Sequence, residues 1–338
     1  MGCLVLTEAE VQRIRRQLEE FPWYRRVFAG FRERVDEWIE RKPEIPVEKG
    51  RAFWESCPND GTLLVFDPYD RYTHRCPKCG TNWSDEKYNG AWVRIFQDWL
   101  QRRAIEAGIL YRVLGGEKYA EVVRDALVHY ADHYEEYPLA NNLLGPTRLF
   151  QSTYLEAFWL NDMVVAYDLV SESPCFAPED HAKIRQLFYA STAIIRSFDE
   201  RISNRQAFNN VGMGAVALLY DDAELLEHVL RGPSGFEFQL QASLLEDGLW
   251  YEGENYHFAT LDHLLNLAEL ARHRDIDLYT PLRPMFEGPL KLMYPDFTFP
   301  SRKDGWFGRG ILYHKDIYEL GYARYRDERM GGLLSQAY

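Results

Sequence analysis

Residues 91–116 read AWVRIFQDWLQRRAIEAGILYRVLGG, and this stretch decides the class of fold. Apolar residues recur at steps of three or four, as at Ile105, Ile109 and Val113, which is the spacing of one face of an α-helix. The pair Gly115-Gly116 then ends the helix. Because the same pattern returns along most of the chain, the sequence predicts an all-α protein.

The chain divides into three predicted regions. Residues 1–41 form an N-terminal helical segment, which Thr7 caps and Pro22 interrupts. Residues 42–90 form a loop-rich insertion that contains Pro, Gly and Cys. In residues 91–338 we expect helices at 91–114, 117–135, 150–171, 178–200, 205–220, 222–246, 257–274 and 280–294. Helices joined by short turns lie antiparallel, and no fixed-period repeat is present, so an incomplete (α/α) toroid of helical hairpins fits best.

Charge and hydropathy exclude two classes of partner. The net charge of -13 argues against general binding of nucleic acid, which rests on a basic surface. No segment reaches the apolar length of a membrane span. The first residues lack the pattern of a signal peptide, so the protein as written is expected in the cytoplasm, although a chain trimmed of an export signal would look the same.

The insertion at 42–90 carries a cysteine pattern typical of a zinc knuckle. Cys76 and Cys79 are separated by two residues, and Cys57 precedes them. Zinc in a structural site takes four ligands, so a fourth is needed. We predict His74 from its place in the sequence, with Asp60 as the alternative because it follows Cys57 at the same spacing. Such a zinc ion would fold an insertion that lacks its own core. Unliganded cysteines or a disulfide are the other interpretations.

Two polar stretches stand at the start of predicted helices. Residues 247–258 read DGLWYEGENYHF and combine a glycine turn, carboxylates, aromatic rings and a histidine. Residues 203–210 read SNRQAFNN and precede a small, apolar helical run. Polar clusters at the ends of successive helices would converge on one mouth of a helical ring, where the aromatic rings could stack on sugars.

The pattern Asp-Gly-x-Trp/Tyr-x-Glu-Gly-x-x-Tyr at residues 247–256 resembles the helical-domain signature of the heparinase II/III-like and alginate lyases. Residues 57–92, 145–167 and 204–218 also resemble stretches of these proteins, so the likeness covers about residues 50–325. The resemblance implies a lyase that cuts an acidic, uronic-acid-containing polysaccharide by β-elimination. It also implies a C-terminal β-sandwich, which we expect to be missing here or supplied by a separate partner, because the chain shows no run of alternating strands.

The resemblance further implies catalytic roles. Elimination requires that the sugar carboxylate be neutralised, that the C5 proton be removed and that the departing O4 oxygen be protonated. Tyr256 matches the family's catalytic tyrosine and is predicted to be the general acid and base. Asn209 stands where many relatives have histidine, and an amide can donate a hydrogen bond but cannot act as a base. Asn209 and Asn210 are therefore predicted to neutralise the carboxylate, unless the enzyme is altered or inactive.

Several further residues are expected to contact the substrate, and each also has an ordinary structural interpretation. Asparagines at a helix start can be caps, and arginines can tie loops together. The predicted substrate-binding residues are Arg148, Gln151, Arg205, Trp250, Glu252, His257 and Arg302.

Other functions stay open at this point. A glycoside hydrolase on the same ring would use a carboxylate pair drawn from Asp247, Glu252 and Glu254. A carbohydrate-binding relative would keep the helical ring without its base. A uronate epimerase would share the proton abstraction and differ in the fate of the carbanion.

Overall fold

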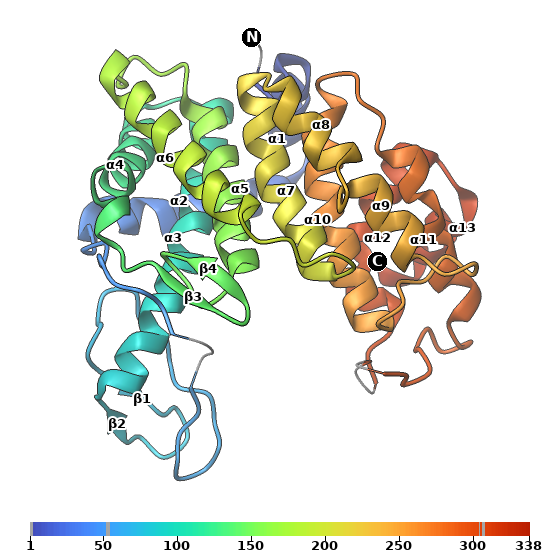
Figure 1. Cartoon of the computed structure of the whole chain (residues 1–338), viewed down its shortest axis with the longest axis horizontal. Helices are drawn as coiled ribbons and strands as arrows, with labels where there is room; N and C mark the ends of the chain where they lie inside the picture. The colour runs from blue at the N-terminus through green and yellow to red at the C-terminus, as the bar shows by residue number, and fades with distance from the viewer. Residues whose placement is uncertain (1–2, 52–54, 304, 306–307) are drawn as a thin grey trace. The chain divides into compact units, whose positions relative to one another are not determined.

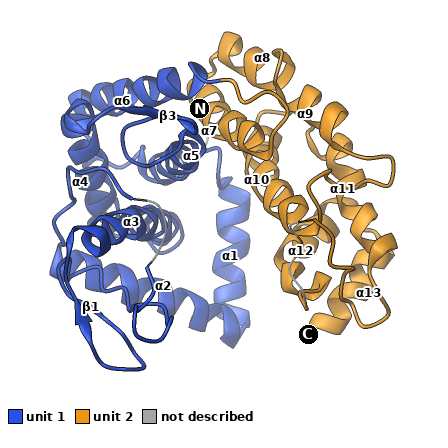
Figure 2. Cartoon of the chain, turned by 60° about the horizontal axis from the view of Figure 1, so that its bottom comes forward, with its two compact units in different colours: residues 1–198 blue, residues 199–338 orange. Residues whose placement is uncertain are grey.

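The computed structural model describes residues 3–338, except 52–54, 304 and 306–307 (Figure 1). The chain divides into two compact units, Met1–Phe198 and Asp199–Tyr338 (Figure 2). In the part of the chain that is described, no helix has the length and apolar character needed to cross a membrane.

Unit 1 consists mainly of helices, with two small antiparallel hairpins. The hairpins are β1 (His74–Arg75) with β2 (Asn82–Trp83), and β3 (Ala140–Asn142) with β4 (Gly145–Thr147). The helices are α1 (Glu8–Glu20), α2 (Pro22–Arg41), α3 (Glu86–Leu114), α4 (Glu117–His133), the short 3-10 helix η1 (Tyr134–Glu136), α5 (Thr153–Val170) and α6 (Pro178–Arg196).

The first two helices begin where the sequence indicates. The Thr7 hydroxyl accepts a hydrogen bond from the backbone N–H of Glu10, and the Glu10 carboxylate accepts one from the backbone N–H of Thr7. This reciprocal capping box satisfies amides that the first helical turn would leave unpaired. Pro22 starts α2, where its missing N–H costs nothing.

Helices α3 and α5 form the centre of unit 1 and run parallel. The Arg94 guanidinium lies 5.1 Å from the ring of Phe150, just before α5 begins. Further along, Gly108 approaches Leu169 so closely that a Cβ on Gly108 would lie 2.8 Å from the Leu169 Cβ. The residue numbers of the contacting positions increase together in the two helices, so the helices run in the same direction. The intervening α4 and the following α6 run back along this pair and pack on it.

Unit 2 contains the remaining helices. They are α7 (Asn204–Tyr220), α8 (Ala223–Arg231), α9 (Phe236–Ser243), α10 (Glu254–Arg272), α11 (Tyr279–Leu292), the 3-10 helix η2 (Ile311–His314), α12 (Lys315–Tyr325) and α13 (Glu328–Ala337).

Helices α7 and α10 pack together in the middle of unit 2, and they too run parallel. The rings of Phe208 and His263 lie 4.6 Å apart between centroids. Further along both helices, a Cβ on Gly214 would lie 2.6 Å from the Leu267 Cδ1. Glycine at 214 thus allows the close approach of the two helices, and the starts of α7 and α10 point the same way.

The predicted all-α class is confirmed, and three differences from the predicted helices are large, whereas other limits differ by four residues or fewer. The single helix expected at 222–246 is wrong, because a turn closed by the Gly235 N–H and the Gly232 carbonyl separates α8 from α9. Helix α3 begins at Glu86 rather than residue 91, since the Asp85 side chain caps two of its amides. Helices α12 and α13 were not expected from the sequence.

Candidate functional site

The glycines of residues 247–253 shape the entrance to α10. Gly248 has φ of 86°, and a Cβ there would lie 2.4 Å from the carbonyl oxygen of Pro284 in α11. Gly253, just before α10, has φ of 106°. Both positions require glycine, because L side chains rarely adopt such φ values. The Asp247 carboxylate accepts a hydrogen bond from the Leu249 N–H at 3.0 Å and closes the turn. This motif therefore positions the start of α10.

His257 is a structural residue in this turn. It is fully buried, its Nδ1 accepts a hydrogen bond from the backbone N–H of Trp250 at 3.0 Å, and its Nε2 bonds to the Met285 carbonyl at 2.8 Å. Burial lowers the pKa of His257 to about 4. The Trp250 ring is also buried, and its Nε1 donates to Glu252 at 2.8 Å. The predicted contact of His257 and Trp250 with substrate is therefore not supported, because neither side chain reaches the surface.

Tyr256 lies on the face of α10 that packs against α7. It shares that face with His263 and Leu267, which follow it by seven and eleven residues and contact α7. The Tyr256 side chain is partly exposed. Within the described residues, its hydroxyl has no hydrogen-bond partner. Tyr256 thus offers a reachable phenol at the entrance of the parallel helix pair.

Asn209 and Asn210, which were predicted to neutralise the substrate carboxylate, are both buried. The Asn210 amide accepts a hydrogen bond from Gln206 at 3.0 Å and donates one to the Ser234 carbonyl at 2.9 Å, so it ties α7 to the turn before α9. The Asn209 amide is fully buried, and neither of its polar atoms has a partner among the residues described. Neither amide is open to a substrate in this structure.

Asn204 lies closer to Tyr256 along the helix pair than Asn209 does, and it was not among the residues predicted from the sequence. Phe208 and His263 mark one level of the helix pair. At a rise of about 1.5 Å per residue, Tyr256 lies about 10 Å before that level and Asn204 about 6 Å before it. Asn209 lies on the far side of the Phe208–His263 level, about 12 Å from Tyr256 along the helix axes. Asn204 also lies within about 40° of Phe208 around α7, whereas Asn209 is turned by about 100°.

The Asn204 amide keeps hydrogen-bonding capacity. Its Oδ1 accepts a weak hydrogen bond from the Ser203 hydroxyl at 3.4 Å. No described residue accepts a hydrogen bond from its Nδ2. Only 6% of Asn204 is exposed. Its Nδ2, which has no described partner, is nevertheless not fully buried. The one signal in the sequence was its place in a polar Ser-Asn-Arg-Gln run that opens a helix.

Two arginines that were predicted to contact the substrate, Arg205 and Arg302, form ion pairs within the protein. Arg302 donates through Nε and Nη2 to the buried carboxylate of Glu254, at 3.0 and 2.7 Å. Arg205 pairs with Glu200, with Nε 2.5 Å from Oε2. Burial raises the pKa of Glu200, and the nearby Arg205 opposes this rise. These arginines fasten loops around the starts of α7 and α10.

Arg148 and Gln151 belong to unit 1, where both stabilise the segment before α5. The Arg148 guanidinium donates to the carbonyls of Glu135 and Tyr137, at 3.0 and 2.8 Å. Its backbone N–H donates to the buried Glu156 carboxylate at 2.7 Å. The Gln151 carbonyl accepts a hydrogen bond from the Asn142 side chain at 3.0 Å. The loop-tying interpretation therefore fits Arg148, while the Gln151 side chain stays partly exposed.

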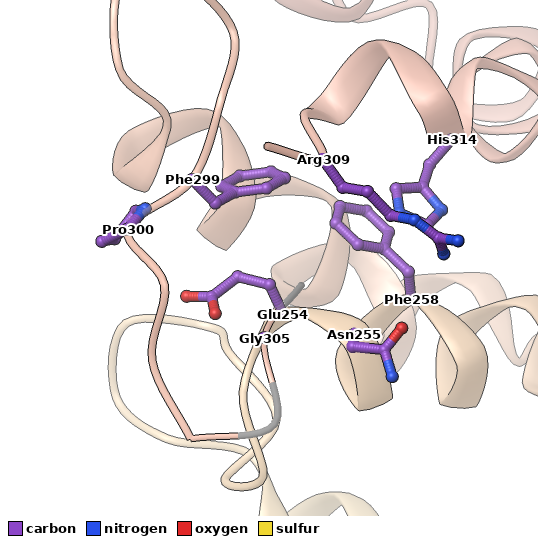
Figure 3. Close-up of a pocket in the computed structure, with 8 residues that line it drawn as sticks. All are labelled: Glu254, Asn255, Phe258, Phe299, Pro300, Gly305, Arg309 and His314. Atoms are coloured by element: carbon purple, nitrogen blue, oxygen red, sulfur yellow. The ribbon is translucent and has the colours of Figure 1, made fainter. Parts of the chain in front are cut away.

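A small cavity lies on the other side of α10 (Figure 3). Its volume of about 20 Å³ holds no more than one or two water molecules. It is lined by Phe258, whose ring stacks on His314 with centroids 3.8 Å apart. Phe258 is turned by about 160° from Tyr256 around the helix. This cavity is therefore too small for a sugar ring and does not open onto the Tyr256 face.

The cysteine-bearing insertion brings together a group that could hold a metal ion. Ligand atoms of Cys57, Asp60, Cys76 and Cys79 all lie within 4.8 Å of one another. The prediction of His74 as the fourth ligand is corrected, because its Nε2 lies 2.9 Å from the Asn89 side chain and bonds there. Asp60, the alternative that the sequence offered, is the residue that lies with the three cysteines.

Two similar turns build this cluster. Residues 57–62 read CPNDGT and residues 76–81 read CPKCGT. In each turn the glycine N–H donates to the first cysteine's carbonyl, Gly61 to Cys57 at 2.9 Å and Gly80 to Cys76 at 3.0 Å. Both glycines have positive φ, 71° and 75°. Three thiols and one carboxylate from paired turns match the donors that a tetrahedral metal ion takes.

Comparison with known proteins places the chain in context. The family model described as heparinase II/III N-terminus matches residues 78–320. An exo-oligoalginate lyase of Saccharophagus degradans is 27% identical over an alignment of 241 residues that covers 64% of this chain and 31% of that protein. An alginate lyase of Stenotrophomonas maltophilia is 25% identical over 258 residues, 69% of this chain and 33% of that protein. The chain thus spans about a third of the length of these relatives.

A solved structure shares the fold. An alginate lyase from Bacteroides ovatus matches with a TM-score of 0.68, over 99% of this chain and 95% of that one, at 13% sequence identity. A likeness at this identity concerns the fold alone, and it confirms the predicted helical toroid class.

Proposed function

Because the chain belongs to the heparinase II/III N-terminus family, we propose that it is the helical part of a lyase that cuts an acidic, uronic-acid-containing polysaccharide by β-elimination. The curated relatives are an exo-oligoalginate lyase and an alginate lyase, so alginate is the first substrate to test. The observation that carries the proposal is the reachable phenol of Tyr256 on the α7-facing side of α10, with Asn204 offset from it by about 4 Å along the helix pair.

The proposed chemistry needs only these two groups at the start of the helix pair. The Asn204 Nδ2 donates a hydrogen bond to the sugar carboxylate and stabilises the charge that develops as C5 loses its proton. Tyr256, as phenolate, takes the C5 proton and then gives it to O4 as the C4–O4 bond breaks and the C4–C5 double bond forms. The proton thus passes from C5 to O4 through one residue, and no separate base is required.

The hydrolase alternative is weakened by the state of its carboxylates. Glu254 pairs with Arg302, Glu252 accepts the Trp250 indole N–H, and Asp247 closes its own turn. A hydrolytic pair needs one free carboxyl group to protonate the leaving oxygen and another to activate water. All three candidates are instead occupied in holding the entrance to α10.

The test is the absorbance of an unsaturated uronate, which elimination produces and hydrolysis does not. The protein is incubated with alginate, heparan sulfate, hyaluronan and chondroitin in turn. We expect the Tyr256→Phe variant to lose about 10²- to 10⁴-fold in rate. Its thermal unfolding should match that of the parent protein, because the hydroxyl has no described partner to lose. Products without a double bond, or an unimpaired Phe variant, would refute the proposal.

We also propose that the metal ion suited to Cys57, Asp60, Cys76 and Cys79 is zinc in a structural role. Zinc prefers thiolate ligands and accepts carboxylate oxygen in a four-coordinate site. The cluster provides all four positions from protein side chains, which is typical of a closed structural site. The ion would join the two turns and stabilise the insertion in front of α3.

A further inference from the structure

A hollow of about 250 Å³ lies in unit 1, between the proline-rich segment after α2 and the loop that joins the two cysteine-bearing turns. We propose that this hollow binds a neutral sugar ring, as a carbohydrate site separate from the residues assigned to elimination. Its volume is somewhat below the 300–1,000 Å³ typical of drug-sized ligands, which suits one ring or two. The residues that carry the argument are Pro43, Glu44, Pro46, Pro68, Arg71 and Tyr72.

The walls of the hollow are flat and rigid. Three prolines line it, and proline presents a fixed ring without a backbone N–H. Tyr72 is 59% exposed, so much of its ring is open to a partner. A tyrosine combines an apolar face with a polar tip, which matches a sugar ring with its C–H face and its hydroxyls.

The loop that carries Tyr72 is held in place without any ligand. The Trp92 indole donates a hydrogen bond to the Asp67 carbonyl at 2.7 Å. The Asp70 carboxylate accepts hydrogen bonds from the backbone N–H groups of Tyr72 and Thr73, at 3.1 and 3.0 Å. Binding would therefore cost little ordering of the loop, which favours affinity from a small contact area.

One unused polar group at the hollow fits a sugar hydroxyl. The exposed carboxylate of Glu44 receives no hydrogen bond from a described residue. A sugar hydroxyl can donate a hydrogen bond to this carboxylate.

The charges of the lining favour a neutral sugar over an acidic one. Glu44 and Asp70 contribute two carboxylates, while Arg71 contributes the one cation among the lining residues described. The Arg71 guanidinium already pairs with Glu48. A uronate would meet a net negative surface with no spare cation, and like charges repel. The same hollow accepts a neutral ring without that penalty.

The experiment uses the full chain and measures binding by calorimetry and ligand-detected NMR. The probes are three neutral trisaccharides (cellotriose, mannotriose and N,N′,N″-triacetylchitotriose) and one acidic probe, a trimer of mannuronate. We expect at least one neutral trisaccharide to bind at the hollow, whereas binding of the acidic trimer, a candidate substrate at the Tyr256 site, should not depend on Tyr72. Tyr72→Ala should lower the affinity for the neutral ligand by about 10-fold, and Glu44→Gln should lower it to a smaller extent.

Two control variants separate this site from others. Tyr338→Ala removes another exposed tyrosine, 79% exposed, and should leave binding unchanged. Tyr256→Phe should also leave it unchanged, because the site does not depend on the proposed lyase chemistry. The inference is overturned if no neutral trisaccharide binds, if Tyr72→Ala weakens the acidic trimer as much as the neutral ligand, or if Tyr72→Ala and Glu44→Gln both bind the neutral ligand as the parent does. Since both substituted side chains are exposed, loss of folding should not obscure the result.

Discussion

The Nδ1 atom of His257 accepts a hydrogen bond from the backbone N–H of Trp250 at 3.0 Å, across a tight glycine turn. Since Nδ1 accepts, the proton of the neutral ring resides on Nε2, which donates to the Met285 carbonyl at 2.8 Å. One imidazole thus connects the turn, the start of α10 and helix α11. The residue directly after the proposed catalytic Tyr256 fixes the backbone that carries it.

Protonation of His257 should destabilise the fold. Burial holds the pKa of His257 at about 4 in the folded chain, against an ordinary value of 6.5. Between these values the unfolded chain binds the additional proton, so the free energy of unfolding falls as the pH falls. The loss from this group is up to about 3 kcal/mol. Urea unfolding at about pH 7 and at about pH 4.5 measures it.

The matched variant is His257→Gln, which cannot titrate. Its unfolding free energy should be lower than that of the parent at neutral pH by about 2 kcal/mol, because a buried backbone group loses its partner. Its dependence on pH should also be shallower. Some dependence will remain, since burial also lowers the pKa of His314 to about 4. If the free energy of unfolding changed equally with pH in the parent and in His257→Gln, this role for His257 would be contradicted.

Asn204 and Asn209 should respond differently to substitution. Asn204→Ala is expected to lower kcat by about 10²- to 10³-fold, the effect of removing one donor that stabilises developing charge. Asn209→Leu should keep the activity and the stability near parental values, because the buried Asn209 amide has no described partner to lose. Rates of double-bond formation and urea unfolding would be measured for both. The reverse order of activities would return the role to Asn209.

The Arg302–Glu254 pair should act mainly on stability. Arg302→Ala leaves the Glu254 carboxylate, 5% exposed, without its partner. We expect a loss of about 1–3 kcal/mol, reduced from the value for fully buried pairs because the Arg302 side chain is 45% exposed. In a double-mutant cycle, adding Glu254→Gln should recover part of the loss. An unchanged stability together with a raised KM would instead assign Arg302 to substrate binding.

The zinc content of the protein should depend on Asp60 and not on His74. Protein expressed with zinc should carry about one zinc ion per chain, measured by elemental analysis after dialysis. Asp60→Ala and Cys76→Ser are expected to lower this occupancy, whereas His74→Ala should retain it, since the His74 ring bonds to Asn89 instead. Retention of zinc by Asp60→Ala, with loss in His74→Ala, would restore histidine as the ligand.

Much of the architecture follows from local patterns. The apolar spacing in residues 91–114 and the capping box at Thr7 act over a few residues, so the helices they specify can be read directly from the chain. The break between α8 and α9 is only partly specified by local pattern. The pair Gly232-Pro233 indicates a break in the sequence, but the closure of the turn that separates the two helices depends on a hydrogen bond between Gly232 and Gly235.

The sequence by itself determined the helical class, the cysteine-bearing turns and the motif around Tyr256. Only the tertiary structure decided which side chains meet. Asn209 and Asn204 are both polar residues near one helix start, but a difference of five residues turns an amide to another side of the helix and moves it several ångströms along the axis. In the same way, Asp60 joins the cysteines while His74 does not, because the fold of the insertion directs the His74 ring to α3. The spacing of residues along the chain specifies which face of a helix each side chain occupies, whereas the packing of the elements specifies which side chains are neighbours.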